Sequence, residues 1–236
     1  MSQFQFTRPN SFPPIIKNLI IINVLVYVMQ IVFEKQLGIT ELFALYPIDL
    51  PEFKPYQLVT HMFTHAPPPM LFHILFNMLM LWMFGRVLEN LWGGKRFLFF
   101  YLACGLGAAA CHLLIQHLQY GPLMQQAEAA LARNDIATVR ELAAKINSSA
   151  VGASGAIMGV MAAFAFTFPN TPLYIMLIPV PVKAKWAILG FVALDLFGGV
   201  SNIRGDNIAH FAHLGGAITG FIIVLIWNKT NRRTLY

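Results

Sequence analysis

The chain has 236 residues, of which 57% are hydrophobic and only 11% are charged. A soluble globular domain normally carries about 25% charged residues, so this composition excludes an ordinary water-soluble fold. The formal net charge of +6 is explained by lysines and arginines at the membrane boundary, where they contact anionic lipid, and it indicates no nucleic-acid partner. We therefore expect a single integral membrane domain covering residues 1–236.

Apolar segments long enough to cross a bilayer recur along the chain. A transmembrane helix needs roughly 20 predominantly apolar residues to cross about 30 Å of hydrocarbon. The first segment is too long and begins too late to be a cleaved signal peptide, so we expect it to remain in the mature protein. The sequence thus predicts an all-α membrane protein with a short, uncharged fourth helix and six spans, at residues 15–37, 70–92, 96–120, 150–168, 184–201 and 208–228.

Charged residues predict the orientation of these spans, because lysine and arginine are retained on the cytoplasmic side of a membrane. With the N-terminus inside, 10 of the basic residues fall inside and 6 outside. The acidic residues are divided more strongly. Glu89 alone falls inside, Asp195 alone falls within a span, and the others fall outside. We therefore expect both termini to be cytoplasmic, in a bacterial cytoplasmic (inner) membrane.

Two segments between the spans are expected to lie outside the hydrocarbon. Residues 38–69 are rich in proline and aromatic residues, which favour the membrane interface, so they predict an interfacial loop. Residues 121–149 are polar and alanine-rich, with apolar residues at helical spacing, and they predict one or two amphipathic helices with a break and a cap at Asn134 and Asp135. This insert is either a spacer on the outer surface or a contact for a partner or substrate.

A serine at the start of the fourth span is the first candidate for chemistry. Ser154 lies between small residues, and Gly155 with Gly159 forms a GxxxG face that permits close helix packing. Taken alone, this pattern is typical of packing, with the hydroxyl bonded to a backbone carbonyl. It is not the G-x-S-x-G elbow of soluble hydrolases, because Gly155 follows the serine directly and no strand precedes it.

A histidine at a matching depth in the sixth span changes this interpretation. Ser154 lies about four residues and His213 about five residues into helices that enter from the same side, so at about 1.5 Å per residue their depths agree. The GxxxG pair Gly216 and Gly220 lets this helix pack directly against the fourth. Ser154 is therefore a candidate nucleophile, with His213 as its general base and then general acid.

A third polar cluster lies in the second span, where His73 and Asn77 are four residues apart and share one helix face. Together with the Ser154 backbone N–H, their side chains are candidate donors to an oxyanion. Asp195, in the outer part of the fifth span, is a possible third member of a triad. No spacing ties it to His213, however, and a role in packing or at the interface explains it equally well.

Four ordered motifs resemble the rhomboid family of intramembrane serine proteases. They are residues 56–65, 73–77, 152–155 with Gly159, and 209–216. The resemblance implies a six-helix bundle with a short central fourth helix that leaves a water-filled cavity open to the outside. It also implies a Ser154/His213 dyad without a carboxylate, with His73 and Asn77 as oxyanion donors, and so argues against a catalytic Asp195. Gly152, Gly155, Gly159, Gly216 and Gly220 would be the packing glycines near the site.

The resemblance also implies a class of substrate and a route to the site. Substrates would be single-pass transmembrane proteins whose helices are weakened by small residues near the cut. The gate would be formed by Phe191, Leu194 and Phe197 on the fifth helix and by residues 198–206. No cofactor is implied.

Two other classes of function stay open at this stage. A metal-ion transporter or metallohydrolase would use His73, His210 and His213 as zinc ligands, since imidazole suits zinc, but the sequence contains no H-E-x-x-H motif. A catalytically silent adaptor for transmembrane helices would be expected to have lost the serine or the histidine, and both are present. We therefore expect a serine endopeptidase without a metal. For His210 two roles stay open: a structural residue that bonds the backbone of the site, which is the preferred interpretation, or a direct part in the chemistry.

Overall fold

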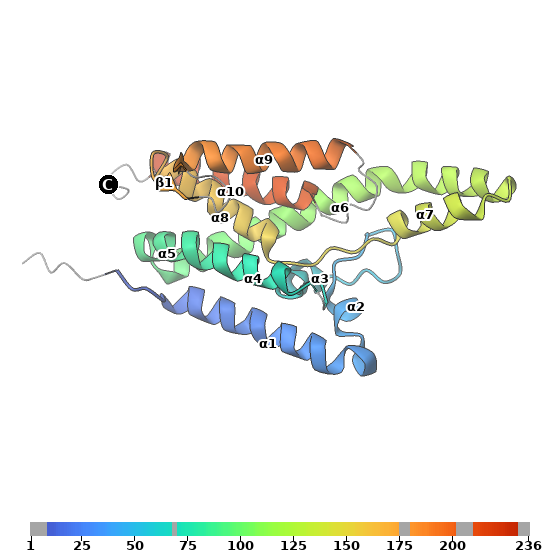
Figure 1. Ribbon diagram of the computed structural model, residues 1–236, viewed down its shortest axis with the longest axis horizontal. Helices are drawn as coiled ribbons and strands as arrows, with labels where there is room; N and C mark the ends of the chain where they lie inside the picture. Colours follow the sequence, from blue (N-terminus) through green and yellow to red (C-terminus); the bar gives the residue numbers. More distant parts are fainter. Residues whose placement is uncertain (1–8, 68–69, 175–179, 202–209, 231–236) are drawn as a thin grey trace, which may run out of the picture.

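The computed structural model describes residues 9–67, 70–174, 180–201 and 210–230. The chain is almost entirely helical in these ranges (Figure 1). A short hairpin pairs β1 (Pro172–Leu173) with β2 (Val182–Lys183) in antiparallel register. The helices are α1 (Pro14–Leu37), α2 (Ile39–Phe43), α3 (Gln57–Thr60), η1 (His61–Phe63), α4 (Leu71–Met80), η2 (Leu81–Gly85), α5 (Arg86–Trp92), α6 (Gly94–Ala132), α7 (Ile136–Ile146), α8 (Ser154–Thr167), α9 (Ala184–Ser201) and α10 (His210–Thr230).

The prediction of an all-α membrane bundle is confirmed. Within the described ranges, four helical stretches are long and apolar enough to cross a membrane: α1, the continuous run from α4 to α5, α6 and α10. The run from α4 to α5 passes through a π-helical turn, η2, without a break. The count of six spans stays a prediction, because α8 has only 14 residues and α9 is not among these four.

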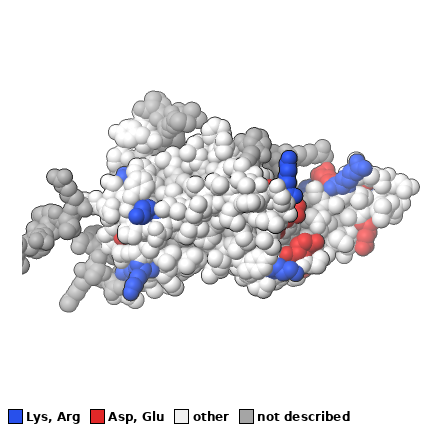
Figure 2. Space-filling view, turned by 90° about the horizontal axis from the view of Figure 1, so that it is seen from below, with Lys and Arg blue, Asp and Glu red and all other residues white. Residues whose placement is uncertain are grey.

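The two ends of the bundle differ in charge. The start of α1 and the end of α10 lie at the same end of the molecule, on the left of Figure 1. Acidic side chains gather at the opposite end of the face drawn in Figure 2, where residues 38–66 and α7 lie, whereas basic side chains occur at both ends. The buried carboxylate of Glu89 is an exception near the first end, where it accepts the N–H groups of Ile15 at 2.9 Å and Ile16 at 2.8 Å.

Helix α8 lies at the centre of the bundle and packs against α6 and α10. Glycines make this close approach possible, because a Cβ on Gly220 would lie only 2.6 Å from the carbonyl oxygen of Gly159. A Cβ on Gly216 would overlap the carbonyl of Gly155 in the same way. The two GxxxG faces of the sequence therefore meet, and their contact fixes how α10 lies across the start of α8.

The two segments between the spans fold differently. Residues 38–66 wind through α2, α3 and η1 and fold back onto the bundle. The third predicted span, at 96–120, lies within a longer helix, since α6 continues through Pro122 to Ala132. The chain then turns at Asn134, whose φ of 56° is left-handed, and Asp135 caps α7 by accepting the N–H of Thr138 at 3.1 Å.

Candidate active site

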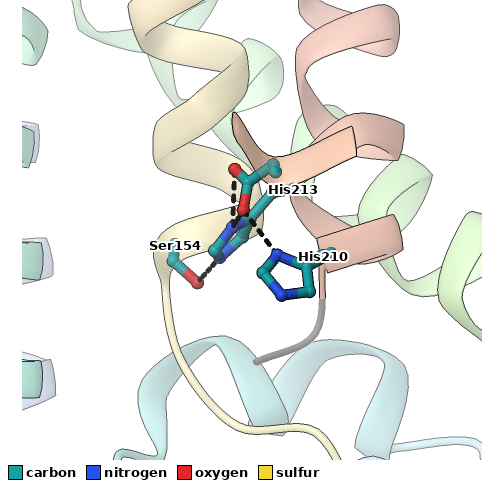
Figure 3. A network of polar contacts seen from close by, with 4 residues as sticks. Ser154, His210 and His213 are labelled. Atoms are coloured by element: carbon teal, nitrogen blue, oxygen red, sulfur yellow. Dashed lines mark hydrogen bonds and ion pairs between the residues drawn. The ribbon is translucent and has the colours of Figure 1, made fainter. Parts of the chain in front are cut away.

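The start of α8 and the start of α10 bring a serine and a histidine into contact. Ser154 is the first residue of α8, and His213 lies in the first described turn of α10. Ser154 Oγ is 2.7 Å from His213 Nε2, and Figure 3 shows the ring of His213 turned toward the hydroxyl. This distance is that of a short hydrogen bond, in which the hydroxyl donates to the imidazole nitrogen. The pair that was predicted from helix depth is thus brought together.

The other ring nitrogen of His213 faces a carboxylate. Nδ1 of His213 lies 3.0 Å from both carboxylate oxygens of Asp195 on α9. Nδ1 of His210 is 2.9 Å from Asp195 Oδ1, so two histidines share the carboxylate (Figure 3). His210, which was expected to bond the backbone of the site, therefore contacts a side chain. The polar chain runs from Ser154 through His213 and Asp195 to His210.

This contact differs from what the sequence predicted for Asp195. The resemblance implied a dyad without a carboxylate, and no spacing linked Asp195 to His213. One signal was available, because His210 and His213 are three residues apart and so share one face of α10. Which residue of α9 meets that face depends on how the two helices cross, and the helical pattern of neither segment contains that information.

His73 approaches the serine from α4, with its tautomer set by the backbone. The N–H of Ala66 donates to Nδ1 of His73 at 3.1 Å, so the proton of the neutral ring lies on Nε2. A Cβ placed on Gly152 would lie 3.0 Å from that Nε2 and 3.5 Å from Ser154 Oγ. The Nε2–H donor of His73 therefore borders the space beside the serine hydroxyl.

Asn77 is held differently from His73. Its side-chain Nδ2 donates to the carbonyl oxygen of His73 at 2.7 Å, one turn back on the same helix. The side chain is buried, and this bond uses one of its two N–H groups. The structure therefore places His73 beside Ser154 and ties Asn77 to the backbone of His73.

The backbone around Ser154 supplies further donors. The first N–H groups of a helix have no acceptor within the helix, and the helix dipole makes this end favourable for negative charge. Ser154 and Gly155 occupy that position in α8. Gly152 just before them has a φ of 124°, a conformation that favours glycine, and its N–H donates to the carbonyl of His61 at 2.9 Å. Residues before α8 are thus anchored to η1.

A small cavity borders the serine, and two of the side chains that line it were not predicted from the sequence. It is lined by Gly152, Ser154 and Ala212, and by two further histidines, His61 and His112. Nδ1 of His61 lies 2.7 Å from the carbonyl of Gln57, and burial lowers the pKa of His61 below its ordinary value. His61 is therefore neutral near pH 7 and lines the cavity as an uncharged polar group.

The residues that were predicted to form a gate lie on α9. Phe191, Leu194 and Phe197 are exposed on the outer surface of this helix. Of the gate loop at 198–206, residues 202–206 lie outside the described residues. In the part of the chain that the structure describes, no group of three or more His, Cys, Asp or Glu side chains is arranged to hold a metal ion.

A serine at the start of one helix and two histidines on another thus meet inside an apolar helical bundle. The family model described as Rhomboid domain matches residues 52–229, and the chain belongs to the rhomboid family. The family membership that the four motifs predicted is thereby confirmed.

Curated relatives agree with this assignment. RHOMBOID-like protein 12, mitochondrial, of Arabidopsis thaliana is 31% identical over 213 residues, which are 88% of this chain and 56% of that protein. Rhomboid protein 1, mitochondrial, of Saccharomyces cerevisiae is 29% identical over 64% of this chain and 36% of its own length. The human presenilin-associated rhomboid-like protein, mitochondrial, is 29% identical over 67% and 36%. The chain thus spans about half the length or less of these relatives.

These relatives correct one prediction. All three are named as mitochondrial proteins, so the assignment to a bacterial cytoplasmic membrane is wrong, whereas a multi-pass membrane protein stands. The physical reason is that hydropathy predicts that the chain crosses a bilayer, and the placement of lysine and arginine predicts the orientation of the chain in it. They do not distinguish between bilayers that impose the same constraints on span length and charge.

Proposed function

We propose that this chain is an intramembrane serine endopeptidase, with Ser154 as the nucleophile and His213 as the general base and acid. The observation that carries the proposal is the 2.7 Å contact between Ser154 Oγ and His213 Nε2. A serine hydroxyl is a weak nucleophile at neutral pH, and an imidazole in hydrogen-bond contact activates it by taking its proton.

In this mechanism, Ser154 Oγ attacks the carbonyl carbon of the scissile peptide bond while its proton passes to His213 Nε2. The resulting tetrahedral intermediate collapses when His213 gives that proton to the departing amine, which leaves an ester on Ser154. Water then attacks the ester while His213 takes its proton, and His213 returns that proton to Ser154 Oγ as the ester bond breaks, which releases the new carboxyl end and restores the serine. Both steps use the same two side chains in alternation.

Negative charge on the carbonyl oxygen needs donors at the place where it develops. The candidates are Nε2–H of His73, whose tautomer is set by Ala66, and the N–H groups at the start of α8. Asn77 is proposed as a further donor through the N–H that is not bonded to the carbonyl of His73. In a low-dielectric site these fixed donors are worth more than they are in water.

The proposed substrates are single-pass transmembrane proteins. A backbone carbonyl within a membrane helix is already hydrogen-bonded, so the helix must unwind locally before Ser154 and water can reach it. The exposed apolar side of α9, with Phe191, Leu194 and Phe197, is the proposed place of entry. The names of the relatives indicate a mitochondrial membrane as the location.

The test is fluorophosphonate labelling and cleavage of a generic single-pass substrate in detergent, comparing wild type with Ser154→Ala and His213→Ala. We expect wild type to label and to cut, and both variants to lose labelling and to cut at least about 1,000-fold more slowly. Cys111→Ser, a small change on α6, is the matched control and should label as wild type does.

Other outcomes point to other classes of protein. If Ser154→Ala cuts as fast as wild type and a chelator stops cleavage, a metal mechanism replaces the serine mechanism. If wild type neither labels nor cuts while remaining folded, the chain is a binding protein for transmembrane helices.

A further inference from the structure

Asp195 is a charged side chain in a helix that lies against the site, and the proposed Ser154/His213 chemistry does not use it. A carboxylate inside a membrane bundle is costly and is therefore expected to have partners. Its partners here are the Nδ1 atoms of His213 and His210, at 3.0 and 2.9 Å. With 16% of its side chain exposed, Asp195 is largely shielded from solvent.

We infer that Asp195 is a positioning residue that holds His213 in the tautomer and orientation needed to accept the proton of Ser154. The inference rests on the proposed function of the Ser154/His213 pair. It adds a carboxylate to a site whose resemblance implied a dyad alone.

The first argument is the chemistry of the donors and acceptors. An ionised carboxylate can only accept hydrogen bonds, so Nδ1 of His213 must carry the proton that bridges to Asp195. In the neutral ring the proton-free nitrogen is then Nε2, which lies 2.7 Å from Ser154 Oγ. The contact with Asp195 thus selects the tautomer in which His213 can act as a base.

The second argument is electrostatic. When His213 takes the proton of Ser154 it becomes a cation, and an anion at 3.0 Å stabilises that cation. The titratable side chains that face His213 in the described structure are His73 on α4, His112 on α6, His210 on α10 and Asp195 on α9. Asp195 is the one anion in this set, since the other three are histidines.

The third argument concerns what holds Asp195 itself. His210 lies against Gly198, three residues after Asp195 on α9, and a Cβ on Gly198 would fall 2.6 Å from Nε2 of His210. The glycine leaves room for the ring whose Nδ1 contacts Asp195 Oδ1. His210 thereby limits the movement of the carboxylate, so Asp195 is held between the rings of His210 and His213.

A purely structural role for Asp195, as a lock between α9 and α10, would stabilise the protein without affecting the proton transfer. The two roles are separated by measuring the rate of fluorophosphonate labelling of the full chain as a function of pH, for wild type, Asp195→Asn, Asp195→Glu and His210→Gln. Labelling of wild type and its loss in Ser154→Ala are tested first, so that failure of the proposed function is recognised separately.

Asp195→Asn is expected to label at least about tenfold more slowly, because its amide can donate to Nδ1 and so favour the tautomer that cannot accept a proton from Ser154. The acidic limb of the pH–rate curve should differ from that of wild type, whereas a purely structural role for Asp195 would leave its position unchanged. Asp195→Glu should restore part of the rate. His210→Gln, whose amide still donates to the carboxylate, should retain more of the rate than Asp195→Asn does. An Asn variant with the rate and acidic limb of wild type would overturn the inference.

A measurement on the unmodified site covers the case in which Asp195→Asn does not fold. Nitrogen-15 NMR of histidine-labelled wild type, with His213 assigned by comparison with His213→Gln, reports which ring nitrogen carries the proton. The expected result near neutral pH is a neutral ring protonated at Nδ1. A ring protonated at Nε2 contradicts the inference whether or not the protein cleaves any substrate.

Discussion

The two segments that extend beyond the spans, residues 38–66 and the insert at 121–149, are held to the bundle by different means. Buried side-chain amides hold the first. Gln30 of α1 accepts the N–H of His65 at 3.0 Å and donates to its carbonyl at 2.7 Å, which ties the segment to the bundle. Within the segment, Gln57 accepts the N–H of Lys54 and donates to the carbonyl of Glu52. Both glutamines are buried, with 1% of the surface of each residue exposed.

The insert is held by contacts at the surface. Gln116 of α6 donates to the carbonyl of Ser148 in the insert at 2.9 Å, in an exposed contact. Surface contacts of this kind contribute little to stability, whereas a buried group that loses its partner costs much more. The first segment also reaches the site, through the bond from the Gly152 N–H to His61. We therefore expect damage to the first segment to affect activity and damage to the insert to have little effect.

The largest expected effect is at the junction of the first segment and the site. Gly152→Ala adds a Cβ at a φ of 124°, 3.0 Å from His73 Nε2. We expect the labelling rate to fall about 100-fold, because the added atom displaces an oxyanion donor. The matched control is Gly121→Ala in the insert, where a Cβ meets nothing within 4 Å and should leave the rate as it is. Equal labelling rates for Gly152→Ala and Gly121→Ala would show that the site is no more sensitive to the first segment than to the insert.

The next effect concerns stability. Gln57→Leu leaves the N–H of Lys54 and the carbonyl of Glu52 without their partner, at a cost of about 2–4 kcal/mol in the free energy of unfolding. Gln116→Leu on α6 removes a surface bond to Ser148 of the insert and should cost less than about 1 kcal/mol. Unfolding by a denaturing detergent in mixed micelles measures both. A Gln116 variant as unstable as the Gln57 variant would contradict the contrast between buried and surface contacts.

Acid should destabilise the first segment before it affects the insert. Burial, together with the neighbouring His73, lowers the pKa of His65 from its ordinary 6.5 to about 3. Between these two values the unfolded chain binds the proton and the folded chain does not, so the free energy of unfolding decreases as pH falls from 6.5 toward 3, by up to about 1.4 kcal/mol per pH unit. His65→Gln should flatten this slope in a pH series of unfolding measurements, and Ser148→Ala should not. If the two variants show the same slope, groups other than His65 cause the pH dependence of the free energy of unfolding.

The smallest effect is expected at the cap of α7. Hydrogen bonds from the side chain and the backbone of Thr138 lower the pKa of Asp135 below its ordinary value of 3.8. The stabilisation is therefore present above pH 3.8 and is lost as pH falls through the lower value in the folded protein. Asp135→Ala should increase amide exchange in the first turn of α7 at neutral pH and leave the labelling rate unchanged. A slower labelling rate would mean that the insert is coupled to the site.

Much of the fold was predictable because it depends on length and hydropathy. The predicted spans at 15–37, 70–92 and 184–201 agree with the observed helices to within about one residue. The family itself was predictable from four motifs whose order and spacing are specific. The cap at Asp135 was also predictable, since its effect is local to the residues that follow it.

What the sequence did not predict depends on how elements meet. The fourth span was expected from residue 150, but α8 begins at Ser154, because Gly152 bonds to His61 and takes a left-handed φ that ends any helical path there. The contact between Asp195 and His213 likewise depends on the crossing of α9 and α10. Such contacts join residues far apart in sequence, and neither helical periodicity nor local composition contains them.

The carboxylate of Glu89 has a consequence for the order in which the protein is assembled. It accepts the N–H groups at the start of α1 from a position 73 residues further along the chain than Ile16. During synthesis the first helix is therefore made and inserted while its initial N–H groups still depend on water or lipid head groups for partners. Those groups obtain their permanent acceptor only once α5 has been synthesised and placed beside them. A nascent chain stopped before residue 89 has the complete first helix but lacks the carboxylate that accepts its initial N–H groups.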